Sequence, residues 1–308
     1  MRNIDLIPSD KQSHESWLIQ FIMGFMGMKK AMYKKIVHNS YNKYPSKIPV
    51  SLFKYCDVKT EEIFGRKVWT ISKKNTISGN IVLFLHGGAY YANISYLHWS
   101  FVARLAEITD STIVVPDYQL APEFTCFDTY RFMNNLYSKI LSSYPEKQIV
   151  LMGDSAGGGL ALGFAQKISF ENIRQPEHIF LFSPWLDATM TNPEISVLDK
   201  SDKILSIDGL KMAGINYAGN IGITDYRVSP IYGDLSRLGK LTIFVGTNEI
   251  LMADARMLKQ KLDLMGIDFN YFAYPDMFHD WVLVHWLKES RKVLQWIKVY
   301  FEALNKRN

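Results

Sequence analysis

The chain has 308 residues, of which 48% are hydrophobic, and this is enough for a sizeable core in one large α/β domain or two smaller ones. Its 35 basic residues against 30 acidic ones leave a net charge of only +5, and the densest basic pairs, Lys29-Lys30 and Lys34-Lys35, fit a solvated helix face rather than a nucleic-acid patch. The two cysteines, Cys56 and Cys126, exclude a disulfide framework and lack the spacing of a zinc site, so we expect a reducing, cytoplasmic location.

Residues 1–45 are expected to be helical and basic. The apolar run from Trp17 to Met28 is too short to span a bilayer. Acidic residues precede it and lysines follow it, which is the reverse of a signal peptide. We interpret the run as an amphipathic helix that packs on the protein, with contact to a membrane surface as the alternative.

The rest of the chain alternates between strand-like and helix-like segments. Strands are expected at 58–71 (with a turn at 64–66), 80–85, 111–116, from 148 to the glycines at 153, and at 177–183, 241–245 and 269–274. Helices are expected at 96–108, 127–141, after 155, at 254–265 and at the C-terminus. This alternation predicts an α/β fold with a mostly parallel central sheet flanked by helices on both sides.

One polar segment interrupts the alternation. Residues 188–224 carry only short helical pieces, and we expect them to be inserted over the carboxyl edge of the sheet, where open α/β sheets bind ligands. Together with residues 1–45 they would form a helical cap. The prediction is therefore a single domain, 1–308, with a catalytic core of 46–187 and 225–308.

The stretch Gly153-Asp-Ser-Ala-Gly157 reads G-x-S-x-G between an apolar strand and a helical pattern. In that setting it predicts a nucleophile elbow, a sharp turn that exposes the hydroxyl of Ser155 above the sheet edge. The flanking glycines are required because side chains at these positions would clash across the turn.

A serine nucleophile needs a base, an acid that orients the base, and donors for the oxyanion. Among seven histidines, His279 alone follows the elbow in a loop after a strand; His98 is expected in a helix far from any strand end. Glu249 directly follows the strand at 241–245 and is the expected acid, with Asp254 as the alternative. The expected oxyanion donors are the backbone N–H groups of Ala156, Gly87 and Gly88.

Several motifs together resemble the hormone-sensitive-lipase-like esterases, the α/β-hydrolases with an HGGG-type oxyanion motif. The similar segments are His86-Gly-Gly-Ala-Tyr90, Asp117-Tyr-Gln-Leu-Ala-Pro-Glu123, Gly153-Asp-Ser-Ala-Gly-Gly158, Ser183-Pro-Trp-Leu-Asp187 and Met277-Phe-His-Asp280. The chain departs from the pattern at Ala89, Gln119 and Glu249. The resemblance implies an α/β-hydrolase fold with a helical cap and hydrolysis of carboxylic esters.

We therefore expect a carboxylesterase that acts on short-to-medium acyl esters through Ser155, His279 and Glu249 and an acyl-enzyme. Tyr90, Trp185, Phe278 and Phe25 are the expected substrate-binding side chains, and no metal or cofactor is needed. The partner is a small-molecule ester; the family resemblance raises a homodimer as a further option. An amidase or small-peptide hydrolase, and a catalytically silent binding protein, are the alternatives.

Overall fold

The computed structural model describes residues 4–8, 11–76 and 79–306. Within them nine strands form one sheet, in the order β1 (Ile4–Leu6), β9 (Phe269–Tyr274), β8 (Lys240–Gly246), β7 (His178–Phe182), β6 (Gln148–Asp154), β4 (Asn80–Leu85), β5 (Thr112–Pro116), β3 (Arg66–Lys73) and β2 (Cys56–Ile63). Only β3 runs against its neighbours β2 and β5; the other pairs are parallel. The predicted α/β class with a mostly parallel sheet is confirmed.

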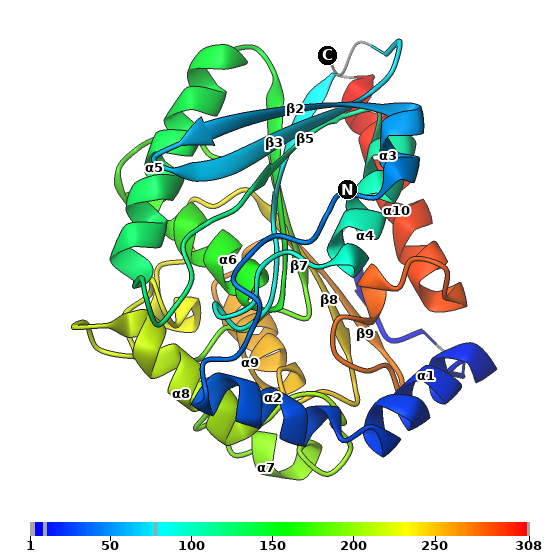
Figure 1. Ribbon diagram of the computed structural model, residues 1–308, viewed down its shortest axis with the longest axis vertical. Helices are drawn as coiled ribbons and strands as arrows, with labels where there is room; N and C mark the ends of the chain where they lie inside the picture. The colour runs from blue at the N-terminus through cyan, green and yellow to red at the C-terminus, as the bar shows by residue number, and fades with distance from the viewer. Residues whose placement is uncertain (1–3, 9–10, 77–78, 307–308) are drawn as a thin grey trace.

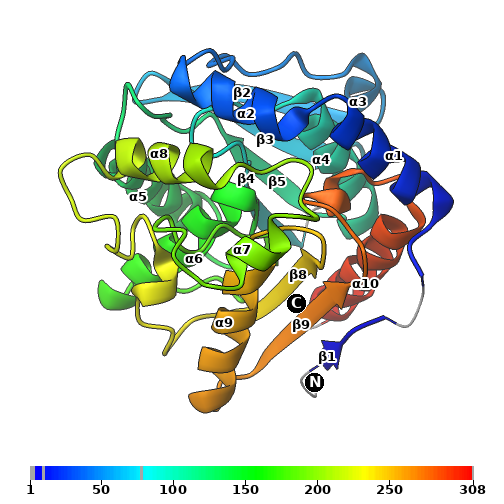
Figure 2. The ribbon, with the colours of Figure 1, turned by 90° about the horizontal axis from the view of Figure 1, so that it is seen from below.

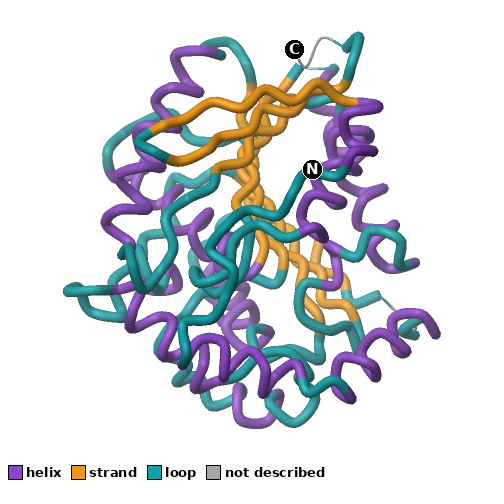
Figure 3. Tube along the Cα trace, in the orientation of Figure 1, coloured by secondary structure: helices purple, strands orange, loops and turns teal. Residues whose placement is uncertain are grey.

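Helices cover both faces of the sheet because the strands are apolar on both faces. One face packs on α5 (Cys126–Ser143), α6 (Ser155–Phe170) and α9 (Met252–Leu264), and the other on α3 (Val50–Tyr55), α4 (Tyr96–Thr109) and α10 (Lys288–Asn305) (Figure 1). Strand β4 shows the alternation: Leu83 and Leu85 enter the first core cluster, whereas Val82 and Phe84 enter the second. The tube trace in Figure 3 shows the twisted sheet running through the middle of the molecule.

Four further helices form a layer beyond the carboxyl ends of the central strands. These are α1 (His14–Phe25), α2 (Met28–Val37), α7 (Ile195–Leu198) and α8 (Ile207–Ala218). Figure 1 shows them along the bottom of the molecule, and Figure 2 shows α2 beside α8 from below. The two helices approach closely, since a side chain at Gly209 of α8 would lie 3.3 Å from Ile36 of α2. Two 3₁₀ turns, Pro230–Tyr232 and Trp281–Leu283, complete the described elements.

The N-terminal segment differs from the expectation of a continuous helical region. Its first described residues form β1, a parallel edge strand on β9. Three residues are too few for an alternating pattern to be visible in the sequence, so the strand depends on the open edge that β9 offers. Residues 1–3 and 9–10 of the predicted segment 1–45 lie outside the described residues.

Helix α1 also differs from the expectation that its apolar residues pack on the protein. Ile19 and Met23 contact the second core cluster, but the residues most buried in α1 are Ser16 and Gln20. The exposed large side chains are Trp17, Leu18, Phe21, Ile22, Phe25 and the following Met26. No helix in the described part of the chain is long and apolar enough to cross a membrane.

The polar face of α1 is attached to α10 through one carboxylate. Glu289 accepts hydrogen bonds from the backbone N–H of Ser13 at 2.6 Å, from its hydroxyl at 3.1 Å, and from the hydroxyl of Ser16 at 2.8 Å. Burial alone would raise the pKa of Glu289, but these donors bring it below the ordinary glutamate value. The attachment is therefore strongest above that ordinary value and weakens as pH falls through the lowered pKa.

We expect Glu289→Ala to loosen α1 without unfolding the core, because it removes the shared acceptor of three hydrogen bonds. Charged hydrogen bonds of this kind contribute about 2 kcal/mol, which corresponds to about 30-fold faster amide hydrogen exchange in residues 14–25. Glu302→Ala, on the same helix but exposed, is the control and should leave that exchange unchanged. Equal protection of α1 in both variants would contradict the proposed attachment.

Candidate active site

The turn from β6 into α6 is as sharp as the motif requires. Ser155 has φ 49°, a left-handed conformation that costs a non-glycine residue energy and that is common at functional sites. A side chain on Gly153 would lie 2.3 Å from the carbonyl oxygen of Gly157, and one on Gly157 would lie 2.1 Å from that of Leu85. Both positions therefore exclude a Cβ. The close contact between the end of β6 and the start of α6 holds the serine at the carboxyl edge of the sheet.

His279 and Glu249 come to this serine from the ends of two other strands. His279 Nε2 lies 2.9 Å from Ser155 Oγ, and its Nδ1 lies 2.6 Å from Glu249 Oε2. Glu249 follows β8, and its other oxygen accepts from the Gly246 N–H at 2.8 Å and the Ser183 hydroxyl at 2.7 Å. The buried carboxylate is thereby satisfied on both oxygens, which is the condition for retaining a buried charge.

Asp254, the alternative acid, lies away from the imidazole. It sits in the first turn of α9, where its Oδ1 accepts from the side-chain amide of Asn192 at 2.9 Å. Burial raises the pKa of Asp254 to about 7, so the carboxyl is poorly suited to hold a permanent negative charge near neutral pH. Of the two candidates, Glu249 is the one that contacts His279.

A second carboxyl faces the imidazole from the serine side. Asp280 Oδ2 lies 3.1 Å from His279 Nε2, the same nitrogen that faces Ser155. A carboxyl that is next to a histidine in the chain rarely points at the ring of that histidine. Asp280 does so because its backbone is left-handed, with φ 57°. Nothing in the sequence pattern signals that conformation, although aspartate tolerates it better than most residues.

The two carboxyls oppose the effect of burial on His279. Burial alone would lower the pKa of His279, but Asp280 and then Glu249 raise it well above the ordinary histidine value. Burial raises the pKa of Asp280 to about 6, against the lowering effect of His279. The imidazole therefore holds its proton to a higher pH than a free histidine does.

The oxyanion prediction needs one correction. The N–H of Gly87 donates to Asp154 Oδ2 at 2.9 Å, so it already has a hydrogen-bond partner within the protein. Within the described residues, no hydrogen bond from the N–H of Gly88 or Ala89 to another protein group is present. Ala156 lies in the first turn of α6, where N–H groups have no partner within the helix.

Asp154 connects this loop to α4 through a residue that sequence reasoning placed far from the site. His98 Nε2 lies 3.1 Å from Asp154 Oδ2. The Ser95 N–H donates to His98 Nδ1 at 3.1 Å, which leaves the proton on Nε2 and directs it at the aspartate. Helix α4 starts beside the same sheet edge, a placement that spacing along the chain does not reveal.

A cavity of about 400 Å³ opens onto the serine. Its wall joins Ser155, His279 and Asp280 to residues from the outer helical layer and the Gly88–Ala89 loop. The other lining residues are Met26, Met28, Ala31, Met32, Lys35, Tyr41, Ile204, Leu205 and Leu210. Most of this wall is apolar, and much of it comes from α2 and from the start of α8 with the loop before it.

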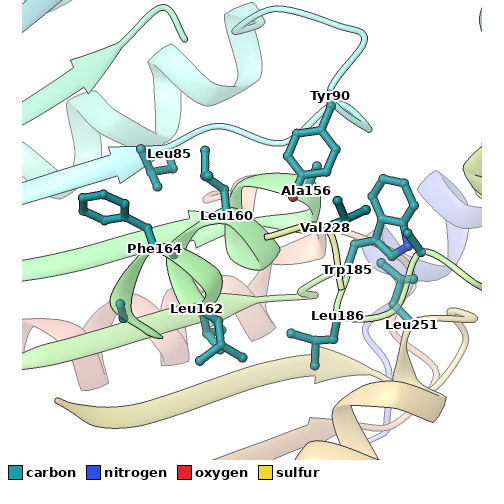
Figure 4. Packing of buried hydrophobic residues seen from close by; sticks show 14 of the residues in the cluster. Leu85, Tyr90, Ala156, Leu160, Leu162, Phe164, Trp185, Leu186, Val228 and Leu251 are labelled. Atoms are coloured by element: carbon teal, nitrogen blue, oxygen red, sulfur yellow. The ribbon is translucent and has the colours of Figure 1, made fainter. Parts of the chain in front are cut away.

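The four predicted substrate-binding side chains do not line this cavity. Tyr90, Trp185 and Phe278 are almost fully buried in the core. Tyr90 stacks on Tyr217 with ring centroids 3.7 Å apart, and Figure 4 shows Tyr90 and Trp185 among the buried hydrophobic side chains of the core. Phe25 lies at the end of α1 with 86% of its surface exposed. The chain then turns at Gly27, which has φ 63°, and Met26 and Met28 line the cavity where Phe25 was expected.

No group of three or more potential metal-ligating side chains occurs in the part of the chain that the structure describes. The site as described consists of one serine, one histidine, two carboxyls and backbone donors. Such a set performs proton transfer and nucleophilic attack.

Comparison with known proteins places the chain in a family. The model of a family described as having the α/β-hydrolase fold matches residues 82–283. An esterase of Acinetobacter venetianus is 28% identical over 237 residues, which are 76% of this chain and 78% of that protein.

Solved structures agree in fold. The crystal structure of the esterase EstE5 soaked with p-nitrophenyl butyrate is 23% identical and has a TM-score of 0.81, covering 96% of this chain and 99% of that one. A bacterial esterase of the hormone-sensitive lipase family is 21% identical with a TM-score of 0.80, covering 95% and 98%. The fold and the family that the motifs implied are confirmed: the chain belongs to the α/β-hydrolase-fold family.

Proposed function

We propose that this protein is a carboxylic-ester hydrolase that uses Ser155 as nucleophile, His279 as general base and acid, and Glu249 as the orienting acid. The observation that carries the proposal is the continuous hydrogen-bonded path from Ser155 Oγ through His279 to Glu249 Oε2. Ester hydrolysis is also supported by the similarity to the Acinetobacter venetianus esterase.

The proposed mechanism follows from the order of these contacts. His279 takes the proton of Ser155 as the serine attacks the ester carbonyl, and Glu249 stabilises the imidazolium that forms. The N–H groups of Gly88, Ala89 and Ala156 hold the oxyanion, with Ala89 in place of Gly87. His279 then protonates the leaving alcohol, and water repeats the sequence on the acyl-enzyme.

The outer helices are proposed to act as the cap. Residues of α2 and α8 contribute to the cavity wall together with Ser155 and His279, which supports a cap built from the segments near 1–45 and 188–224 over the core at 46–187 and 225–308. A mainly apolar cavity of about 400 Å³ is at the small end of ligand sites and favours short-to-medium acyl groups. The unpaired Cys56 and Cys126 support the proposed cytoplasmic location.

Hydrolysis of p-nitrophenyl esters from acetate through palmitate tests the nucleophile and the size of the pocket. We expect turnover to peak at short or medium chains and Ser155→Ala to lower it by about 10⁴-fold or more. Ser142→Ala, at an exposed position on α5, is the matched control and should retain wild-type turnover. Equal turnover by Ser155→Ala, or none by the wild type on any chain length, would refute the esterase proposal; cleavage of amides alone would favour the amidase alternative.

Two isosteric amides test which carboxyl is the acid. Glu249→Gln should lower kcat/KM by about 10³- to 10⁴-fold, because the amide cannot stabilise the imidazolium and can hold the wrong tautomer. Asp254→Asn should stay within about threefold of the wild type, because Asp254 contacts Asn192 and not His279. The reverse pattern would assign the role to Asp254.

The acid limb of the pH profile tests the influence of Asp280. Because the pKa of His279 is raised above its ordinary value, the base form should be lost at a higher pH than for a free histidine, and kcat/KM should fall there. Asp280→Asn removes a charge 3.1 Å from Nε2 and should move this limb to lower pH. Asp276→Asn, in the same loop but exposed, should leave the limb in place; coincident profiles for all three proteins would show that Asp280 does not tune the base.

A further inference from the structure

Helix α1 turns Ser16 and Gln20 to the protein together with Ile19 and Met23, and most of its large apolar residues face the outside. Trp17 and Phe21 are 56% and 59% exposed, and Phe25 is 86% exposed. The rings of Trp17 and Phe21 stack with centroids 5.5 Å apart. These three residues and the adjacent Leu18, Ile22 and Met26 form what we call the α1 outer face. A contiguous apolar patch of this kind on a water-soluble surface usually marks an interaction site.

The orientation of α1 is specified by its inner face. The carboxylate of Glu289 binds Ser13 and Ser16, and the side chain of Gln12 donates to that of Gln20 at 3.0 Å and to the carbonyl of Asp276 at 2.9 Å. Rotating the helix to bury its aromatic residues would break these hydrogen bonds and remove the three donors from Ser13 and Ser16 to the buried Glu289 carboxylate. The outer face is therefore held toward the outside by the fold.

The segment of the chain that carries this face has charges of one dominant sign. Residues 11–35 contain five lysines, at positions 11, 29, 30, 34 and 35, and one acidic residue, Glu15. Lys29 is paired with Asp199 at 2.5 Å, and Lys30 and Lys34 are exposed on α2. An apolar face of Trp, Phe and Leu that is followed along the chain by a lysine-rich helix is a combination found in segments that lie in the plane of a lipid interface.

The outer face also continues into the cavity above the serine. Met26 is 69% exposed, yet it lines the cavity together with Met28 and Met32. An apolar path therefore leads from the α1 outer face past these methionines to Ser155.

We propose that the α1 outer face docks on a lipid surface that carries anionic headgroups, and that acyl esters enter the cavity from that surface along Met26 and Met28. The docking stands independently of the proposed function, whereas the delivery of a substrate rests on it. The apolar side chains would sink about 5–10 Å into the headgroup region while the lysines stay at the headgroups.

A lipid surface fits this face better than a second copy of the chain. A two-fold contact through α1 would bring two segments of the same net positive charge together, because the same patch meets itself in a symmetric dimer. Anionic headgroups complement that charge and attract each nearby lysine.

Co-sedimentation with vesicles tests the proposal. The wild type should bind vesicles of phosphatidylcholine with added phosphatidylglycerol, and less well those of phosphatidylcholine alone. The double variant Trp17→Ser, Phe21→Ser should bind at least about tenfold more weakly, since two large apolar side chains no longer insert. Its matched control is Phe170→Ser, Trp286→Ser, which removes an exposed phenylalanine and an exposed tryptophan elsewhere and should bind like the wild type.

A second variant separates the electrostatic contribution. Lys30→Gln, Lys34→Gln should weaken binding to the anionic vesicles by about fivefold for each lysine and leave binding to neutral vesicles unchanged. Thermal unfolding of every variant checks that α1 substitutions do not destabilise the fold, as expected for exposed positions.

Three results would overturn the proposal. These are no binding by the wild type, equal binding by the Trp17/Phe21 variant and its control, or a concentration-dependent dimer that this variant abolishes without any vesicle binding. Hydrolysis of p-nitrophenyl acetate in solution is measured on the same samples. If the wild type does not hydrolyse p-nitrophenyl acetate, the esterase proposal is refuted, but the result of the vesicle-binding experiment still holds.

Discussion

The crossing of β6 and α6 beneath Ser155 is the constraint on which the rest of the site depends. A side chain on Gly157 would clash with the carbonyl of Leu85, and a side chain on Gly153 would clash with the carbonyl of Gly157, so both positions require glycine. That contact fixes the serine in its left-handed conformation at the sheet edge. Since neighbouring parallel strands end at the same edge, the loops after β8 and β9 bring Glu249 and His279 to the same place.

Buried charge shapes the surroundings of the serine. Glu249 is satisfied by Gly246 and Ser183 as well as by His279, and Asp154 receives the Gly87 N–H and His98. Glu249 thus has fixed donors on both oxygens and Asp154 has them on Oδ2, and these hydrogen bonds connect the strand ends and the loop after β4. Asp280 is the exception, because its partner is His279 Nε2, the same nitrogen that faces Ser155. Its presence makes the protonation of His279 depend on two carboxyls rather than one.

The outer helical layer combines two roles that the core does not provide. Helices α2 and α8 pack together and contribute residues to the cavity wall. Helix α1 is attached by polar contacts, and its aromatic residues face outward. An ordinary surface helix has the opposite arrangement, with its apolar stripe against the core. Because hydrogen bonds on the inner side of α1 fix the orientation of the helix, the exposure of its apolar face is a consequence of the fold and not of a disordered terminus.

The sequence by itself determined the sheet apart from its edge strand β1, together with the elbow and the candidates Ser155 and His279. Apolar runs of strand length and glycines around a serine are local patterns with few alternatives. It left the acid open between Glu249 and Asp254, since both follow the same strand. Only the tertiary structure decided which carboxyl meets His279, that Asp280 turns onto the ring, and that the Gly87 N–H is occupied by Asp154. The orientation of α1 was likewise decided by its contact with Glu289 on α10. These features depend on contacts between segments far apart in the chain or on a single left-handed residue, and no periodic pattern along the sequence records them.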